Sequence, residues 1–228
     1  MSASTLDSAA LNAELERLRP LAEMGRMAAT VAHEIRNPLT GISANAELLR
    51  ETLTDPADIE SMDIILGEVD RLGRLVTDLL YYSRERVAER RPIDLAFIAR
   101  TTVELSQTDA EKAGVNLIWN GAGTAQGDAE LARQALLNVI RNAIQATPKG
   151  GRVEVRVTPS AIRVVDTGSG VPEALRGRLF EPFVTGRTRG LGLGATVASR
   201  CLQRQGGDLR LESTSDHGST FVLCWEHA

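Results

Sequence analysis

One short stretch of the sequence groups three side chains that could do chemistry. His33 is followed by Glu34, and Asn37 lies four residues beyond the histidine. The surrounding apolar residues recur in steps of three and four, which predicts an amphipathic helix; they are Leu21, Met24, Ala28, Val31, Ile35, Leu39, Ile42, Ala46, Leu49 and Leu53. On such a helix His33 lies opposite the apolar stripe and shares its face with Asn37. We therefore take His33, Glu34 and Asn37 as candidate catalytic residues.

An ordinary solvated helix face would show the same three residues. Pro38 favours a functional interpretation, because proline removes a backbone donor in mid-helix and leaves the carbonyl of Glu34 without its partner. The lost hydrogen bond costs stability beside an exposed histidine. We therefore expect the local distortion of the helix to have a function.

A second group of polar residues lies on a predicted helix that begins after Asp128 and ends near Thr147. Asn138 and Asn142 are four residues apart and so share one face. Amides on an otherwise apolar helix need a partner or a ligand. A simple polar face is the alternative, and Arg141 and Gln145 favour it.

The segment 166–170 follows a predicted strand and reads Asp-Thr-Gly-Ser-Gly. A carboxylate at a strand end, Asp166, is a good acceptor for an exocyclic amine. Gly168 and Gly170 let the backbone approach a flat ring. Alone, this pattern is most often a turn.

A glycine-rich segment, 190–194, precedes a predicted helix and contains Gly190, Gly192 and Gly194. Backbone amides at a helix start form a phosphate site when glycines permit close approach. The spacing matches neither the dinucleotide fingerprint nor the lysine-containing P-loop. Upstream, Phe180 and Phe183 could anchor a loop, and Arg187 could pair with phosphate or remain a solvated charge.

Taken together and in this order, these segments resemble five sequence boxes of sensor histidine kinases. They are the H box at 33–39, the N box at 134–143, the G1 box at 166–172, the F box at 179–183 and the G2 box at 190–194. The resemblance covers about residues 21–226; its most specific part is the run His-Glu-Ile-Arg-Asn-Pro-Leu at 33–39. It implies an ATP-dependent autokinase that phosphorylates His33 and passes the phosphoryl group to an aspartate of a response regulator, with a dephosphorylating activity that uses Asn37.

The resemblance also implies roles in binding Mg²⁺ and ATP. Asn142 would supply an oxygen to Mg²⁺, and Asp166 would bind the adenine amino group. The other nucleotide-binding residues would be Asn138, Gly168, Gly170, Phe183, Arg187, Gly190, Gly192 and Gly194. The chain departs from the pattern at Leu191, where the family has threonine, and at Ala195, so a hydroxyl near the phosphates is missing.

Two other functions share parts of this pattern. A hydrolytic ATPase of the gyrase or MutL type would carry a water-activating glutamate where this chain has Asn138, and it would lack the histidine. A non-catalytic dimeric adaptor would show broken N or G1 boxes, and both boxes are intact.

Composition narrows the possible partners and compartment. The 228 residues carry a formal net charge of −4, which argues against nucleic-acid binding. The two cysteines, Cys201 and Cys224, lie in apolar runs and read as small buried residues in a reducing compartment. No apolar run reaches membrane-spanning length. We expect a cytoplasmic protein, unless the chain is part of a longer receptor.

The N-terminal region is expected to form a helical hairpin. Residues 1–20 form a linker or helix start, the first helix ends near Thr54, and Asp55-Pro56 begins the second. A hairpin with one apolar stripe per helix buries that stripe when two copies form a four-helix bundle, so we expect a homodimer. Packing of the stripe on the C-terminal domain is the alternative. Charged residues and Pro92 place the domain boundary after residue 90.

Residues 91–228 are expected to form the second domain, an α+β layer pair that corresponds to the α/β sandwich of the family's ATP-binding domain. Short strands are predicted at 93–95, near Ala125 and at 115–119, 152–158, 161–165, 208–212 and 220–225. Helices are predicted at 96–113, 128–147 and 191–205.

Overall fold

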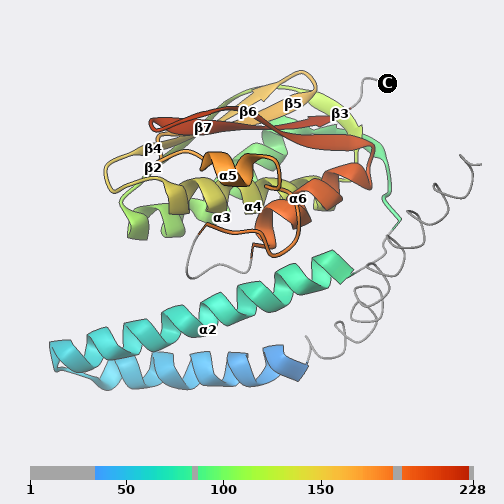
Figure 1. Cartoon of the computed structure of the whole chain (residues 1–228). Coiled ribbons are helices and arrows are strands. Elements are labelled where there is room, and N and C mark those ends of the chain that lie inside the picture. The colour runs from blue at the N-terminus through green and yellow to red at the C-terminus, as the bar shows by residue number, and fades with distance from the viewer. Residues whose placement is uncertain (1–33, 84–86, 187–191, 226–228) are drawn as a thin grey trace, which may run out of the picture. The chain divides into compact units, whose positions relative to one another are not determined.

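The computed structural model describes residues 34–83, 87–186 and 192–225. The chain divides into two compact units between Glu85 and Arg86 (Figure 1). The sequence placed this boundary after residue 90. His33, Arg187 and Gly190 lie outside the described residues, as does the segment 1–20.

The first unit contains an antiparallel helical hairpin, as predicted. Residues 34–52 are helical, and α2 spans Pro56–Ser83. Asp55 caps α2 by accepting a hydrogen bond from the amide of Ala57 at 2.8 Å. Arg50 bonds Asp63 across the hairpin near its turn. Further along, Arg36 Nη2 donates to Thr77 Oγ1 at 3.3 Å, so the two helices are tied at two levels.

Much of the apolar surface of this hairpin is uncovered. Ala46, Val76 and Leu80 are buried, whereas Ile42 and Leu49 are about half exposed. A groove runs between the helices, lined by Pro38, Gly41, Ile42, Asn45, Ala46, Leu49, Met62 and Ile65. The hairpin alone therefore leaves an apolar groove open to solvent.

The second unit is built on a five-stranded sheet in the order β2-β4-β5-β7-β6. Its strands are β2 (Asn116–Gly121), β4 (Arg152–Thr158), β5 (Ala161–Asp166), β6 (Gly207–Ser215) and β7 (Gly218–Trp225). β2 and β4 pair in parallel, and the other neighbours are antiparallel. A separate antiparallel pair is formed by β1 (Arg91–Asp94) and β3 (Thr124–Gly127).

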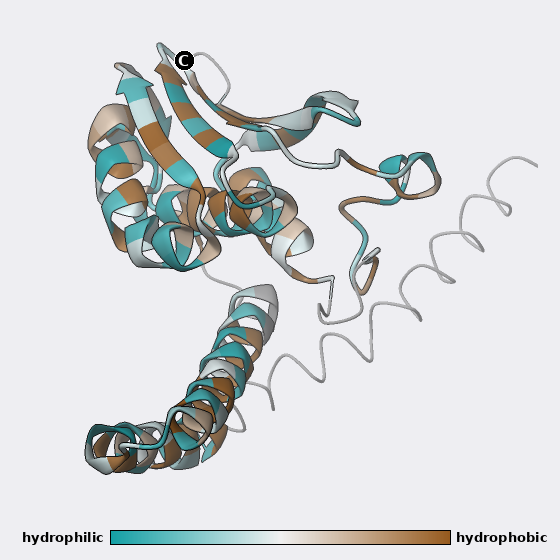
Figure 2. Cartoon of the chain, turned by 90° about the vertical axis from the view of Figure 1, so that its left-hand side faces the viewer, coloured by the Kyte–Doolittle hydropathy of each residue, from teal (hydrophilic) through white to brown (hydrophobic). Residues whose placement is uncertain are grey.

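Three helices, α3 (Leu95–Ala113), α4 (Ala129–Ala146) and α6 (Gly194–Gln203), cover one face of the sheet (Figure 1). The strands show the alternating hydropathy of a sheet with one covered face (Figure 2). The central strands contribute Val153, Val155, Ile162, Val164 and Leu223 to the core, each fully buried. The α+β layer pair expected from the sequence is confirmed.

Local signals at the ends of α3 and α4 behave as the sequence indicates. The Asp128 carboxylate accepts from the amides of Glu130 and Leu131 at 3.1 and 3.2 Å, which caps α4. Asp94, which the sequence assigned to an edge strand, caps α3 in the same way. Gly114 ends α3 with a φ of 68°, a left-handed conformation that glycine adopts without strain.

Two expectations about the segment 166–205 differ from the structure. The helix predicted from residue 191 begins at Gly194, because the chain turns through a left-handed residue, Gly192, immediately before it. The segment 166–190, expected to be irregular, contains a short helix, α5 (Glu173–Arg176).

Within residues 34–83, 87–186 and 192–225, none of the helices is both long enough and apolar enough to cross a lipid bilayer.

Candidate functional site

The two amides of α4 meet the start of α6. Asn138 is buried, and its Nδ2 donates to the Gln134 carbonyl at 3.2 Å. Asn142 is half-buried, one turn further along α4. A β-carbon added at Gly194 would lie 3.5 Å from Asn142 Oδ1 and 3.6 Å from Asn138 Oδ1. Residues separated by more than fifty positions are thus brought together, as the sequence-based hypothesis requires.

The N-terminus of α6 has the properties of an anion site. Its cap residue, Leu193, makes no side-chain hydrogen bond to the first amides of the helix. The first amides of a helix have no partner within it, and the helix dipole favours negative charge there. Because Gly194 has no side chain, an oxyanion at this helix end can approach the backbone and the Asn142 amide together.

Asp166 ends β5 with a carboxylate whose position is fixed by the backbone. Its Oδ1 accepts hydrogen bonds from Gly168 N at 2.8 Å and from Ser219 N at 3.2 Å. The side chain is 5% exposed. A buried carboxylate held by two amides is a rigid acceptor, suited to an amino group on a flat ring.

The turn after Asp166 packs on the end of α4. A β-carbon at Gly168 would lie 2.5 Å from the Ala146 carbonyl oxygen, so any larger residue would displace the turn. A β-carbon at Gly170 would lie even closer to the backbone of β6, against the Ser215 carbonyl oxygen. The carboxylate of Asp166 is thereby held near the helix that carries the two amides.

The segment that contains Phe183 contacts the described end of the glycine-rich segment, at Gly192. Phe183 has a φ of 63°, which is unusual for a residue with a side chain, and it is 53% exposed. A β-carbon at Gly192, whose φ is 67°, would lie 2.5 Å from the Val184 carbonyl oxygen. The residue after Phe183 is therefore in direct backbone contact with Gly192.

The candidate catalytic residues lie in the other unit. Glu34 and Asn37 are exposed at the beginning of the helix 34–52, as predicted. Their position relative to His33 rests on the helical pattern of the sequence.

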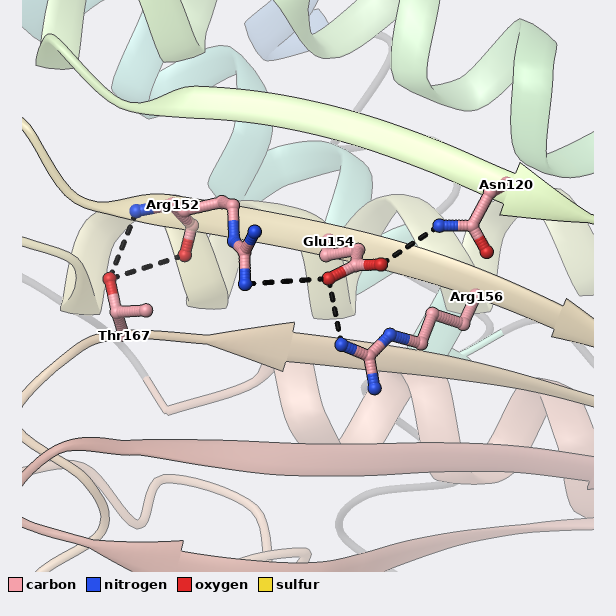
Figure 3. A network of polar contacts seen from close by, with 5 residues as sticks. All are labelled: Asn120, Arg152, Glu154, Arg156 and Thr167. Atoms are coloured by element: carbon pink, nitrogen blue, oxygen red, sulfur yellow. Dashed lines mark hydrogen bonds and ion pairs between the residues drawn. The ribbon is translucent and has the colours of Figure 1, made fainter.

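Sequence reasoning missed a charge network on the uncovered face of the sheet (Figure 3). The Glu154 carboxylate accepts from Arg156 Nη2 and Asn120 Nδ2, each at 2.8 Å, and Arg152 lies 3.7 Å away. The hydrogen bond from Arg156, followed by that from Asn120, lowers the pKa of Glu154 to about 2. Thr167 bonds the backbone of Arg152, which links the network to the turn after Asp166.

The second residue missed is Ser219, whose amide helps to hold Asp166. The sequence feature that could have pointed to Ser219 is the preceding glycine, Gly218. It has a φ of 133° and lies against the Asp166 backbone. Among the described residues, no cluster of three or more histidine, cysteine, aspartate or glutamate side chains could hold a metal ion by itself. A divalent ion at Asn142 would need further ligands from a substrate, which is how Mg²⁺ is usually bound.

Comparison with known proteins identifies both units. The model of the His Kinase A (phospho-acceptor) domain matches residues 23–86, and that of the histidine kinase-, DNA gyrase B-, and HSP90-like ATPase matches residues 127–228. The signal transduction histidine-protein kinase AtoS of Escherichia coli (strain K12) is 34% identical over 219 residues, which cover 92% of this chain and 36% of AtoS.

Solved structures give the same result. Full-length ShkA in complex with AMPPNP matches with a TM-score of 0.66 and 29% identity, over 89% of this chain and 47% of ShkA. The histidine kinase ThkA in complex with the response regulator protein TrrA matches with a TM-score of 0.58 and 28% identity, over 92% of this chain and 65% of that one. The chain thus spans about a third of AtoS and about half of ShkA. It belongs to the sensor histidine kinase family, and it contains the phosphoacceptor and ATPase domains of such a kinase.

Proposed function

We propose that this chain is an ATP-dependent histidine autokinase that phosphorylates His33 and transfers the phosphoryl group to an aspartate of a response regulator. The observation that carries the proposal is the approach of Asn138 and Asn142 to Gly194, beside a rigidly held Asp166. Asn138 also favours a kinase over a hydrolase, because an amide cannot act as the general base that activates water.

In this function the second unit binds and orients the nucleotide. Asp166 accepts the exocyclic amine of adenine, while the amides at the start of α6 and the segment 190–194 bind the phosphates. Asn142 offers an amide oxygen, a ligand that Mg²⁺ accepts. Bound there, Mg²⁺ would neutralise negative charge on the phosphates. Phe183 and Arg187 belong to the segment that covers the nucleotide.

The first unit supplies the nucleophile. A nitrogen of the His33 imidazole attacks the γ-phosphorus, the bond from that phosphorus to the β,γ-bridging oxygen breaks, and ADP leaves. Glu34 accepts the proton from the other ring nitrogen, so that the attacking lone pair stays available. Most of the catalysis then comes from positioning and from neutralisation of charge.

The groove of the hairpin supports a homodimer. Ile42, Leu49, Ile65 and Leu72 are between 44% and 55% exposed, which is unusual for a row of large apolar side chains. A second copy of the hairpin would cover this row and complete a four-helix bundle.

The partner that receives the phosphoryl group is the receiver domain of a response regulator, the class of protein bound to ThkA in its solved complex. Leu48, which is 64% exposed, lies outside the groove and continues the helical face of Asn37, so it offers an apolar contact on that side.

Asn37 would orient water for the reverse, dephosphorylating reaction. The cytoplasm is the compartment that this function requires.

Incubation with γ-labelled ATP and Mg²⁺ tests the proposal. We expect acid-labile label on the wild-type chain and none on His33→Gln or Asn142→Ala. The matched control is His217→Gln, because His217 is almost fully exposed in the turn between β6 and β7 and should be dispensable. Label that persists in His33→Gln, or release of phosphate without labelling, would overturn the proposal.

A further inference from the structure

Asp128 makes a contact that its role as a helix cap does not require. Its Oδ1 caps α4, as described above, while its Oδ2 accepts a hydrogen bond from the backbone amide of Glu89 at 3.0 Å. Glu89 belongs to residues 87–90, which follow the division between the two units and precede β1. One buried carboxylate therefore joins this connecting segment to the first turn of α4.

The residues around Asp128 form a rigid hydrogen-bonded junction, which we call the corner. Gln205 is fully buried, and its Oε1 accepts from the Asp128 amide and from Trp225 Nε1, both at 2.9 Å. Its Nε2 donates to the Cys201 carbonyl of α6 at 2.9 Å. The beginning of α4, the end of α6 and the end of β7 are thus tied through one amide side chain.

The connecting segment also lies over this corner. A β-carbon at Gly206 would lie 2.9 Å from Arg90 Nη1, so the Arg90 guanidinium rests against the turn that follows α6. Glu89 and Arg90 therefore both contact the corner, one through its backbone and the other through its side chain.

The corner and the nucleotide site lie at opposite ends of the same pair of helices. α4 starts at the corner, and Asn142 lies fourteen residues after the cap residue Asp128, a rise of about 20 Å. α6 runs the other way, from Gly194 beside the amides to Gln205 just beyond its end. A change in the connecting segment would therefore act on the ends of both helices that carry the site.

We propose that Asp128 is a positioning residue that fastens residues 87–90, at the start of the second unit, to the α4–α6 pair, and so sets the orientation in which bound ATP is presented to His33. This proposal rests on the proposed kinase function. Asp128 touches no reacting atom; it acts through the backbone of Glu89 on one side and through α4 on the other.

The substitution Asp128→Asn separates the linker contact from the cap. Asparagine caps helices about as well as aspartate, so α4 keeps its cap. Its Nδ2 would replace Oδ2 and face the Glu89 amide, which places two donors together. Glu130→Gln is the matched control, because it removes one negative charge from the same helix end without touching the contact.

Three measurements on the full chain test the positioning role of Asp128. Hydrogen exchange should show that the Glu89 amide loses protection in Asp128→Asn but not in Glu130→Gln. The rate of labelling by γ-labelled ATP should fall by about tenfold, the range in which loss of a hydrogen bond to a charged acceptor lies. The affinity for AMPPNP should change less than about twofold, because the nucleotide site is distant.

A second pair of variants approaches the same bond from the other side. Glu89→Pro removes the donor, whereas Glu89→Ala keeps it and loses only the side chain. We expect Glu89→Pro to reproduce the labelling defect, Glu89→Ala to behave as wild type, and the Glu89→Pro/Asp128→Asn double variant to be no worse than either single one.

The proposal is overturned if the Glu89 amide exchanges equally fast in Asp128→Asn and wild type. It is also overturned if labelling and AMPPNP affinity fall in parallel, which would indicate only a structural role. A wild-type chain that takes no label would remove the kinase assignment itself, whereas a labelled wild type with an equally active Asp128→Asn removes only this proposal.

Discussion

The Glu154 network predicts how the stability of the second unit depends on pH. The folded pKa of Glu154 is about 2, against an ordinary value of 4.5. A carboxyl whose pKa is lowered by folding stabilises the folded state above pH 4.5, and that contribution is lost as the pH falls towards 2. The substitution Glu154→Gln should remove this part of the pH dependence.

The magnitude follows from the size of the shift. A lowering of about 2.5 pKa units corresponds to about 3 kcal/mol in full, of which about 2 kcal/mol would be lost by pH 3. The arginine partners are about half exposed, with side-chain exposures of 52% for Arg152 and 47% for Arg156, so solvent screening reduces the effect. We therefore expect wild type to lose about 1 kcal/mol more than Glu154→Gln between pH 6 and pH 3.

The assay can be carried out on the whole chain. Both tryptophans, Trp119 and Trp225, belong to the second unit, so their fluorescence reports its unfolding by urea without a contribution from the hairpin. Glu212→Gln is the control, since it removes the same charge from a more exposed ion pair with Arg163 on the same face. Equal losses in wild type and Glu154→Gln would refute the reasoning.

Three further substitutions test the site and the dimer. Asp166→Asn keeps an oxygen for the two backbone amides but loses the charge. AMPPNP affinity measured by calorimetry should therefore fall about tenfold or more, while the unfolding midpoint is unchanged. A large loss of stability would contradict this. Gly192→Ala forces a side chain into a left-handed conformation against the Val184 carbonyl, at a cost of about 1 kcal/mol or more. It should therefore weaken AMPPNP binding, and normal affinity would count against the observed packing. Ile65→Lys should yield monomers in analytical ultracentrifugation, whereas Ile64→Lys, outside the groove, should remain dimeric; two monomeric or two dimeric variants would exclude the groove as the interface.

The parts of the fold that the sequence predicted depend on local interactions. Asp55 and Asp128 cap helices through amides two or three residues away, and Gly114 ends a helix by its own conformation. Such signals can be read without knowledge of the rest of the chain. Asp94, which was assigned to an edge strand, occupies both the end of β1 and the cap of α3.

The parts that could not be predicted depend on contacts between distant segments. The two asparagines suggested a ligand, but only the packing of α6 on α4 shows that Gly194 faces them. Glu154 sits in an alternating strand pattern and looks like any solvated residue until β2 brings Asn120 beside it. The contact between Asp128 and Glu89 likewise joins residues that are 39 positions apart.

The most direct test of the kinase assignment is to locate the transferred phosphoryl group. Trypsin should release the peptide 27–36, in which His33 is the only histidine and Thr30 the only hydroxyl-bearing residue. After reaction with ATP and Mg²⁺ under non-acidic conditions, tandem mass spectrometry should place the phosphoryl group on His33, and brief acid treatment should remove it. A phosphoryl group on Thr30, or an unmodified peptide from a chain that consumes ATP, would contradict the assignment.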